Sequence, residues 1–237
     1  MTKIFINPGH SLGCSPDAGC CYNGLKEAAI CVKLAEKVTN LLNSQGFSTQ
    51  LYQQQGANLT SNQQLNNVPK VANASKADLF VSIHMNGFTN PDAKGTETWY
   101  SRGSIVGEKV ATAIHKELTR AFDSYTLKDR GCKIDERGLC VLKSTIMPAI
   151  LIEVGFISNA AEANFIKTHL DAIAQRIVKG ICAYYGKSFV EQQDAYPKSI
   201  KLTRIADNKY NCYIDDMLKL SNNKLSTCLD WIKKTYV

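Results

Sequence analysis

Three short apolar runs, each followed at once by a polar or turn-forming segment, constrain the fold of this chain more than any other feature. They occupy residues 4–6, 79–83 and 149–152. Runs of this length that are rich in Ile, Val and Leu predict buried strands. The polar residues that follow such strands are the first place to look for chemistry.

Other segments extend this pattern into an alternation of strands and helices. Further strands are expected at residues 47–52, 96–100 and 139–142. Apolar residues at helical spacing predict helices over residues 31–42, 106–122 and 166–181. Asn159 and Glu162 resemble a capping box that opens the last of these helices, and Ser61 with Gln64 could open another that Pro69 bends or shortens.

Strands that alternate with helices predict an α/β fold, here a twisted, mostly parallel six-stranded sheet flanked by helices. Ligands of such folds gather beyond the carboxyl ends of the strands. We expect this domain to span residues 1–187, followed by a polar linker at 188–199. Residues 200–237 are expected to form a small, mainly helical C-terminal element, with helices near 214–220 and 225–236.

Composition indicates an ordinary globular protein, because 44% of the 237 residues are hydrophobic and 21% are charged. The net charge of +7 is spread along the chain, with 20 basic and 15 acidic residues up to residue 189 and 8 against 6 beyond it. A diffuse positive field suits a polyanionic surface, and we expect no nucleic-acid partner. No apolar stretch is long enough to predict membrane insertion, and no export signal is visible after Met1.

Two histidines and one glutamate form a candidate metal site. His10 and His84 each follow an apolar strand directly, so both imidazoles can emerge at one edge of the sheet. Glu27 stands at the expected start of the first helix, where the helix dipole favours a carboxylate. Two histidines and a carboxylate leave one position of tetrahedral zinc open, as in catalytic sites.

Glu153 is the candidate general base, because it ends the third apolar run and Gly155 allows a turn beside it. A single His or Glu at a strand end is more often a loop or capping residue, so the assignment depends on the placement of these residues together. Cys14, Cys20 and Cys21 could compete for zinc, but we favour structural or redox roles, since thiolates would close a catalytic site. The nine cysteines are an odd number without regular spacing, so at least one thiol is free in a monomer. His115 and His169 are interpreted as helix-edge residues without a role.

An ordered set of motifs resembles the zinc-dependent N-acetylmuramoyl-L-alanine amidases with the amidase type 3 catalytic domain. The set covers roughly residues 1–186. Its main members are Asn7-Pro8-Gly9-His10, Gly24-Leu25-Lys26-Glu27, Ser82-Ile83-His84-Met85-Asn86 and Ile152-Glu153-Val154-Gly155-Phe156-Ile157-Ser158-Asn159. Departures from the family pattern are Asn7 in place of Asp, Val68 in place of Arg, and the absence of Thr-Arg near Tyr52-Gln53.

The resemblance implies that His10, Glu27 and His84 bind Zn²⁺ and that Glu153 is catalytic. It implies a peptidoglycan substrate, cleaved at the amide between N-acetylmuramic acid and L-alanine of the stem peptide. Asn86 could bind substrate or hold a strand end. The enzyme would act on the bacterial cell wall, as a phage endolysin or as a host autolysin or sporulation enzyme, released by lysis or after loss of a signal.

Two alternatives remain open at this stage. One is a zinc amidohydrolase or carboxypeptidase with another substrate. The other is a non-catalytic wall-binding or regulatory module with the same fold. The C-terminal element could bind the wall or form a dimer.

Overall fold

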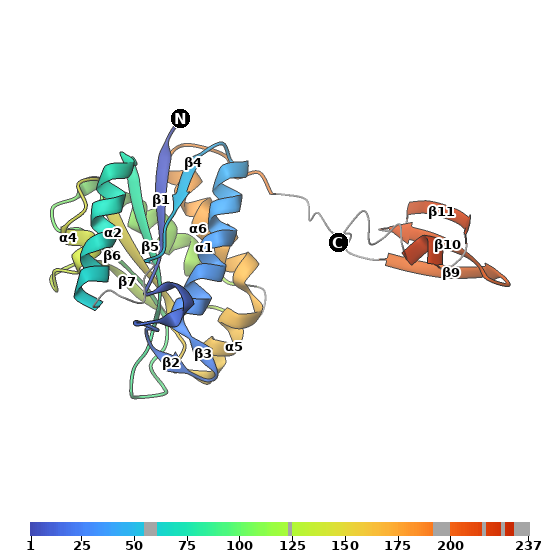
Figure 1. Cartoon of the computed structure of the whole chain (residues 1–237), viewed down its shortest axis with the longest axis horizontal. Coiled ribbons are helices and arrows are strands. Elements are labelled where there is room, and N and C mark those ends of the chain that lie inside the picture. Colours follow the sequence, from blue (N-terminus) through green and yellow to red (C-terminus); the bar gives the residue numbers. More distant parts are fainter. Residues whose placement is uncertain (55–60, 123–124, 192–199, 215–216, 224–225, 230–237) are drawn as a thin grey trace. The chain divides into compact units, whose positions relative to one another are not determined.

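The central sheet has the mostly parallel α/β topology expected from the sequence. The computed structural model describes residues 1–54, 61–122, 125–191, 200–214, 217–223 and 226–229 (Figure 1). They fall into two compact units, Met1–Phe189 and Val190–Val237, each described by itself below. The sheet strands of the first unit are β1 (Lys3–Pro8), β4 (Ser48–Leu51), β5 (Leu79–Asn86), β6 (Thr96–Tyr100), β7 (Asp129–Ile134) and β8 (Ala149–Phe156).

The strand order is β4-β1-β5-β8-β6-β7. Strands β4, β1, β5 and β8 are mutually parallel, and β6 runs antiparallel to β8. At one end of the sheet, the carboxyl ends of β1, β5 and β8 therefore lie beside the amino ends of β6 and β7.

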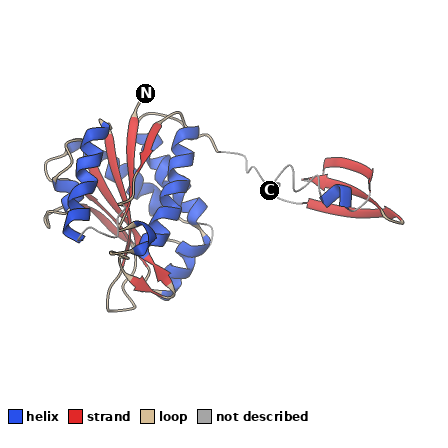
Figure 2. Ribbon diagram, viewed as in Figure 1, coloured by secondary structure: helices blue, strands red, loops and turns tan. Residues whose placement is uncertain are grey.

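Helices cover both faces of this sheet (Figure 2). They are α1 (Glu27–Ser44), α2 (Ser61–Ser75), α3 (Ile105–Leu118), α4 (Cys140–Lys143), α5 (Ala160–Thr168) and α6 (Leu170–Tyr184). The larger core cluster buries apolar residues of α1, α3 and α6 against one face. A smaller cluster packs α2 and α4 against the other face, around Phe5 and Phe80. The two-sided burial explains why the central strands are apolar almost throughout.

Two strand assignments differ from the sequence-based expectation. Residues 139–142 were expected to form a strand, but Cys140–Lys143 is the short helix α4, and its Val141 and Leu142 are buried in the core. An apolar run this short fits either structure. The sixth strand is instead β7, a largely exposed edge strand containing Gly131 at φ 87°, so it lacks a continuous apolar signal.

The helices follow the expected stripes with three differences. α2 continues through Pro69 to Ser75. α3 ends at Leu118, so Phe122 lies outside it although its ring is buried. The third predicted helix is two helices, α5 and α6, because the backbone leaves the helical region at His169.

The second unit corrects the expectation of a mainly helical C-terminal element. It contains an antiparallel sheet of β9 (Ile200–Ala206), β10 (Lys209–Ile214) and β11 (Met217–Asn223), with one helical turn at residues 226–229. The helix expected near 214–220 is therefore largely β11. Alternating Tyr210 and Cys212 favour a strand, and Asn208 at φ 55° makes the tight turn that joins β9 to β10. The helix expected at 225–236 lies mostly outside the described residues.

No helix in the described ranges is long and apolar enough to cross a membrane.

Candidate metal centre and catalytic carboxylate

The chain turns sharply after β1 and brings His10 against His84. His10 has φ 64°, a left-handed conformation that costs about 1–3 kcal/mol outside glycine and is concentrated at functional sites. The backbone N–H of Gly9 donates to the carbonyl of Ile83 at 2.8 Å, which ties this turn to β5. A Cβ on Gly9 would lie 2.5 Å from His84 Nδ1, so only glycine fits beside that ring.

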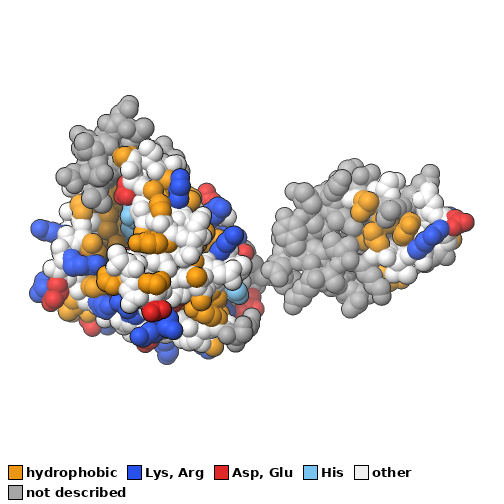
Figure 3. Space-filling view, turned by 90° about the horizontal axis from the view of Figure 1, so that it is seen from below, with side chains coloured by type: hydrophobic (Ala, Val, Ile, Leu, Met, Phe, Trp, Pro, Cys, Tyr) orange, Lys and Arg blue, Asp and Glu red, His pale blue; other side chains and the backbone are white. Residues whose placement is uncertain are grey.

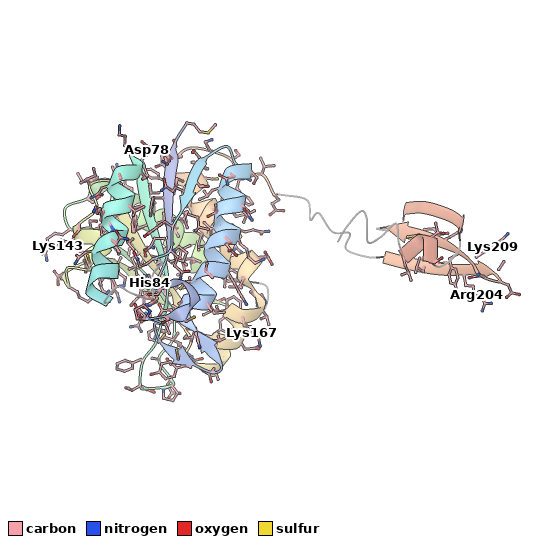
Figure 4. All side chains as sticks on the ribbon, in the orientation of Figure 1. Asp78, His84, Lys143, Lys167, Arg204 and Lys209 are labelled. Atoms are coloured by element: carbon pink, nitrogen blue, oxygen red, sulfur yellow. The ribbon has the colours of Figure 1, made fainter. Side chains whose placement is uncertain are left out.

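His10, Glu27 and His84 converge, as their positions in the sequence predict. One donor atom from each lies within 4.8 Å of the other two. Glu27 Oε1 is 2.9 Å from His10 Nε2 and 3.1 Å from His84 Nδ1. The rings meet edge to face with centroids 4.9 Å apart. Figure 4 places His84 at the end of the sheet opposite Asp78, which precedes the start of β5.

The Glu27 carboxylate is fixed by backbone donors on both oxygens. Oε1 accepts from Met85 N at 3.0 Å, and Oε2 accepts from Cys20 N at 3.0 Å. Burial disfavours the charge, but the two histidines outweigh that penalty and hold the pKa of Glu27 well below its usual range. This carboxylate is therefore ionised and held in a fixed orientation.

Asp17 is a site residue that the sequence reasoning missed. Its Oδ2 is 2.8 Å from His10 Nδ1, so the other nitrogen of that ring faces Glu27. Burial lowers the pKa of His10, but hydrogen bonds and charges from Glu27 and Asp17 prevail and raise it to about 9. The available signal was position: Asp17 is the one acidic residue between His10 and Glu27.

Glu153 lies directly beside the cluster, on β8. Its backbone pairs with His84 on one side and with Glu97 on the other. The side chain is half-buried, and its buried Oε2 accepts no hydrogen bond from the described residues. Burial raises the pKa of Glu153 to about 7, and the charges of Glu27 and Glu97 add to the shift against an opposing effect of His84. A carboxyl group with these properties can take up and release a proton near neutrality.

A cavity of about 120 Å³ adjoins the cluster. His10 and His84 line one wall. The other wall is apolar and comes from α2, α4 and β8, with Val68, Val141 and Leu151. Figure 3, which looks onto this end of the unit, shows a histidine side chain in a hollow beside hydrophobic side chains.

Asn86, the candidate substrate-binding residue, points at a neighbouring ion-pair network. Its Nδ2 donates to Glu97 Oε1 at 2.9 Å. Glu97 Oε2 also receives Arg130 Nε at 3.0 Å and Lys133 Nζ at 2.5 Å. The structure thus gives Asn86 a positioning contact, and a role in binding substrate stays a prediction.

The competing cysteines lie outside the metal-ligand cluster found among the described residues. Burial, with a contribution from the Glu27 charge, raises the pKa of Cys20 far above its usual range, so its thiol stays protonated. Cys14, Cys20 and Cys21 form no disulfide.

The other two histidines lie outside the candidate metal centre and make structural contacts. His115 is buried and bridges Thr98 Oγ1 at 3.2 Å and Asp129 Oδ1 at 2.8 Å, which ties α3 to β6 and β7. The exposed His169 stacks on Phe165 at the break between α5 and α6.

The departures from the family pattern have structural counterparts. Asn7 accepts from Ser82 Oγ at 3.0 Å and donates to the carbonyl of Tyr52 at 3.0 Å, which joins β1 to its neighbours. Gln53 donates to the carbonyl of Gly9 at 3.1 Å and so supports the turn that carries His10.

The site combines two imidazoles, a buried carboxylate and an adjacent unpaired carboxyl group at one end of an α/β sheet. This fold and this site are those of a hydrolase-like protein with a candidate metal centre. Residues 4–224 match the sequence profile of the N-acetylmuramoyl-L-alanine amidases. The chain belongs to this family.

Curated relatives and solved structures agree with that assignment. The germination-specific N-acetylmuramoyl-L-alanine amidase of Bacillus subtilis (strain 168) is 29% identical over 194 residues, covering 77% of this chain and 79% of the relative. The endolysin of Bacillus phage SPP1 is 34% identical over 192 residues, covering 76% of this chain and 65% of the endolysin. The crystal structure of an N-acetylmuramoyl-L-alanine amidase from Clostridium difficile 630 superposes with a TM-score of 0.67 at 30% identity, covering 78% of this chain and 97% of that one.

Proposed function

We propose that this chain hydrolyses the amide between the lactyl group of N-acetylmuramic acid and L-alanine of the peptidoglycan stem peptide. His10, Glu27 and His84 would hold zinc, and Glu153 would be the general base. The observation that carries the proposal is the unpaired Oε2 of Glu153 beside three converging metal-ligand atoms. Membership of the amidase family supports the choice of bond.

The residues present fit zinc. Two imidazole nitrogens and one carboxylate oxygen are the donor set of catalytic zinc sites, which keep a fourth position open. The contact of Asp17 with His10 is the outer carboxylate–histidine bond that orients metal-binding imidazoles. When bound, zinc supplies a Lewis acid that polarises the amide carbonyl and makes water more acidic.

Glu153 would carry the proton through the reaction. Its free carboxylate oxygen accepts the proton of the attacking water, and it then donates that proton to the departing alanine nitrogen. A pKa of about 7 suits both steps, since the group is neither permanently ionised nor permanently protonated at neutral pH. The leaving amine would consequently lie on the Glu153 side of the cluster, toward β6.

Digestion of purified peptidoglycan tests this function. The protein is loaded with zinc or stripped by a chelator, and the products are analysed for new alanine amino groups and new reducing sugar ends. We expect zinc-dependent appearance of alanine amino groups alone. Reducing ends, or release that survives removal of zinc, would contradict the proposal. A protein that binds wall without cleaving it would fit the non-catalytic alternative.

The second unit needs a separate test. We propose that residues 190–237 act as an accessory unit, either in binding the wall or in pairing two copies of the chain. In the first case, ending the chain after Lys187 should lower wall binding and leave the oligomeric state unchanged. In the second case it should convert a dimer into a monomer in size-exclusion chromatography.

A further inference from the structure

Three cationic side chains gather beside the catalytic carboxyl group, and none has a part in the mechanism above. Arg130 and Lys133 belong to β7, and Arg137 follows it; they are called the basic rim here. Arg130 and Lys133 both contact Glu97, whose side chain is 7% exposed. Their own side chains are about one third exposed, at 34% and 33%, so both cations remain accessible to a ligand.

Arg130 and Lys133 share one carboxylate partner. In the described part of the chain, ion pairs join the rim to Glu97 alone. Asp129 pairs with His115, and Glu136 pairs with Arg102. Asp135 is occupied by backbone N–H groups of residues 137 and 139. Two of the cations, Arg130 and Lys133, share the single carboxylate of Glu97, so this cluster can accept a second anionic group from a ligand.

The rim lies within reach of a substrate at the metal centre. Glu97 is the direct neighbour of Glu153 across the β6–β8 pair. Neighbouring strands are roughly 4.8 Å apart, and the Lys133 and Arg130 head groups extend back over β6 to touch Glu97. An extended peptide advances about 3.3–3.6 Å per residue, so the residue after the alanine would arrive at these head groups.

The direction of the substrate follows from the position of Glu153. The base must return its proton to the leaving nitrogen, so the amine half of the substrate lies toward β6 and β7. The muramic acid half then lies toward the opposite side of the cluster. The rim therefore faces the stem peptide.

Trp99 provides an independent sign that this surface takes a ligand. Its ring lies under two cations, with Arg137 Cζ 4.0 Å and Lys133 Nζ 5.0 Å from the centroid. Its buried Nε1 finds no acceptor among the described residues. Buried donors are nearly always paired in native proteins, so this N–H group is available to an acceptor, either a water molecule or a ligand group, that the described residues do not supply.

We propose that the basic rim binds a free carboxylate on the stem-peptide residue that follows L-alanine. The proposal rests on the proposed function. It makes Lys133 and Arg130 determinants of specificity, which favour stem peptides with an ionised second residue over those in which that group is amidated.

Two synthetic muramoyl peptides test it. They differ only in whether the α-carboxyl group of the residue after alanine is free or amidated, and kcat/KM is measured for each with the full chain. We expect the wild-type protein to prefer the free acid by about tenfold, the usual value of one hydrogen bond to a charged group. The preference should shrink as ionic strength rises, because salt screens exposed charges.

Variants locate the determinant. K133M should reduce the preference to near unity, and R130M provides a second variant should K133M fail to fold. K143M is the matched control, since exposed Lys143 lies on α4, away from His84 (Figure 4), and should keep the wild-type preference.

Each outcome separates the two proposals. Equal cleavage of both peptides by the wild-type protein, or a preference that survives K133M and R130M, would overturn the role of the rim and leave the amidase function intact. Failure to cleave either peptide would overturn the proposed function and the inference together.

Discussion

Gly19 offers a direct test of how tightly the ligand cluster is packed. It has φ 66°, and a Cβ added there would lie 2.6 Å from both the His10 ring and Glu27 Oε2. Gly13, in the same loop, has φ 70° and nothing within 4 Å of its added Cβ. Both G19A and G13A therefore carry the strain of a left-handed alanine, about 1–2 kcal/mol. Only G19A pushes on two ligands at once.

The clash sets the expected size of the effect. Ordinary van der Waals contact begins at 3.4 Å. The His10 ring and the Glu27 carboxylate must therefore move away from the added Cβ, from 2.6 Å to 3.4 Å. Overpacking of this kind costs about 1–3 kcal/mol beyond the shared strain. Disturbing the support of metal ligands typically lowers metal affinity by about 10–100-fold. We expect both losses in G19A relative to G13A.

Zinc affinity measured against a competing chromophoric chelator, together with urea unfolding of the metal-free protein, provides the two readings. G13A should lose stability through strain and keep the zinc affinity of the wild-type chain. Equal zinc affinity in G19A and G13A would refute the reasoning, because it would mean that the cluster adapts to the added methyl group without cost.

Three further predictions concern the same site. D17A should weaken zinc binding by about 10–100-fold, because it removes the contact with His10. The control D171A removes an exposed partner of Lys37 and should leave zinc binding unchanged. Equal zinc affinities of the two variants in chelator competition would exclude this role of Asp17. His10 must lose its proton to bind zinc, and its neighbours raise its pKa to about 9. The apparent zinc affinity, measured by calorimetry in zinc-buffered solution, should therefore rise about tenfold per pH unit from pH 7 toward pH 9. A zinc affinity that does not change with pH would contradict the charge assigned to His10. Removal of zinc should lower the melting temperature, because a ligand that binds only the folded chain stabilises it; calorimetric scans with equal midpoints would argue against zinc binding at this site.

The convergence of the candidate metal-binding residues could be predicted because it follows from one simple rule of parallel sheets. Apolar strands buried on both faces end where the chain meets solvent, and His10 and His84 stand at those ends. The position of Glu27 could be predicted because the apolar periodicity that follows it marks the start of α1. Once the strand ends were known, their convergence required only that β1 and β5 be neighbours, as they are.

Features that depend on tertiary contacts could not be predicted from the sequence pattern. Asp17 lies in a loop, and it contacts His10 because of the left-handed turn at His10. No periodic pattern in the sequence predicts that turn. The edge strand β7 is exposed and polar, so nothing in its hydropathy distinguishes it from a loop. His115 lies on a helix stripe, but its buried bridge to Thr98 depends on β6 lying beneath α3. In the second unit, the apolar residues of β10 alternate, but those at 214, 217, 218 and 220 can also be fitted to a helical period, which led to the wrong assignment of β11.

The rate of amide cleavage by E153Q tests the central claim most directly. Glutamine keeps the shape of the side chain and cannot accept the proton of water, and it leaves His10, Glu27 and His84 in place. With zinc content matched to the wild-type protein, we predict that release of alanine amino groups from peptidoglycan falls by about 10²–10⁴-fold. Release within twofold of the wild-type rate at equal zinc content would contradict the account.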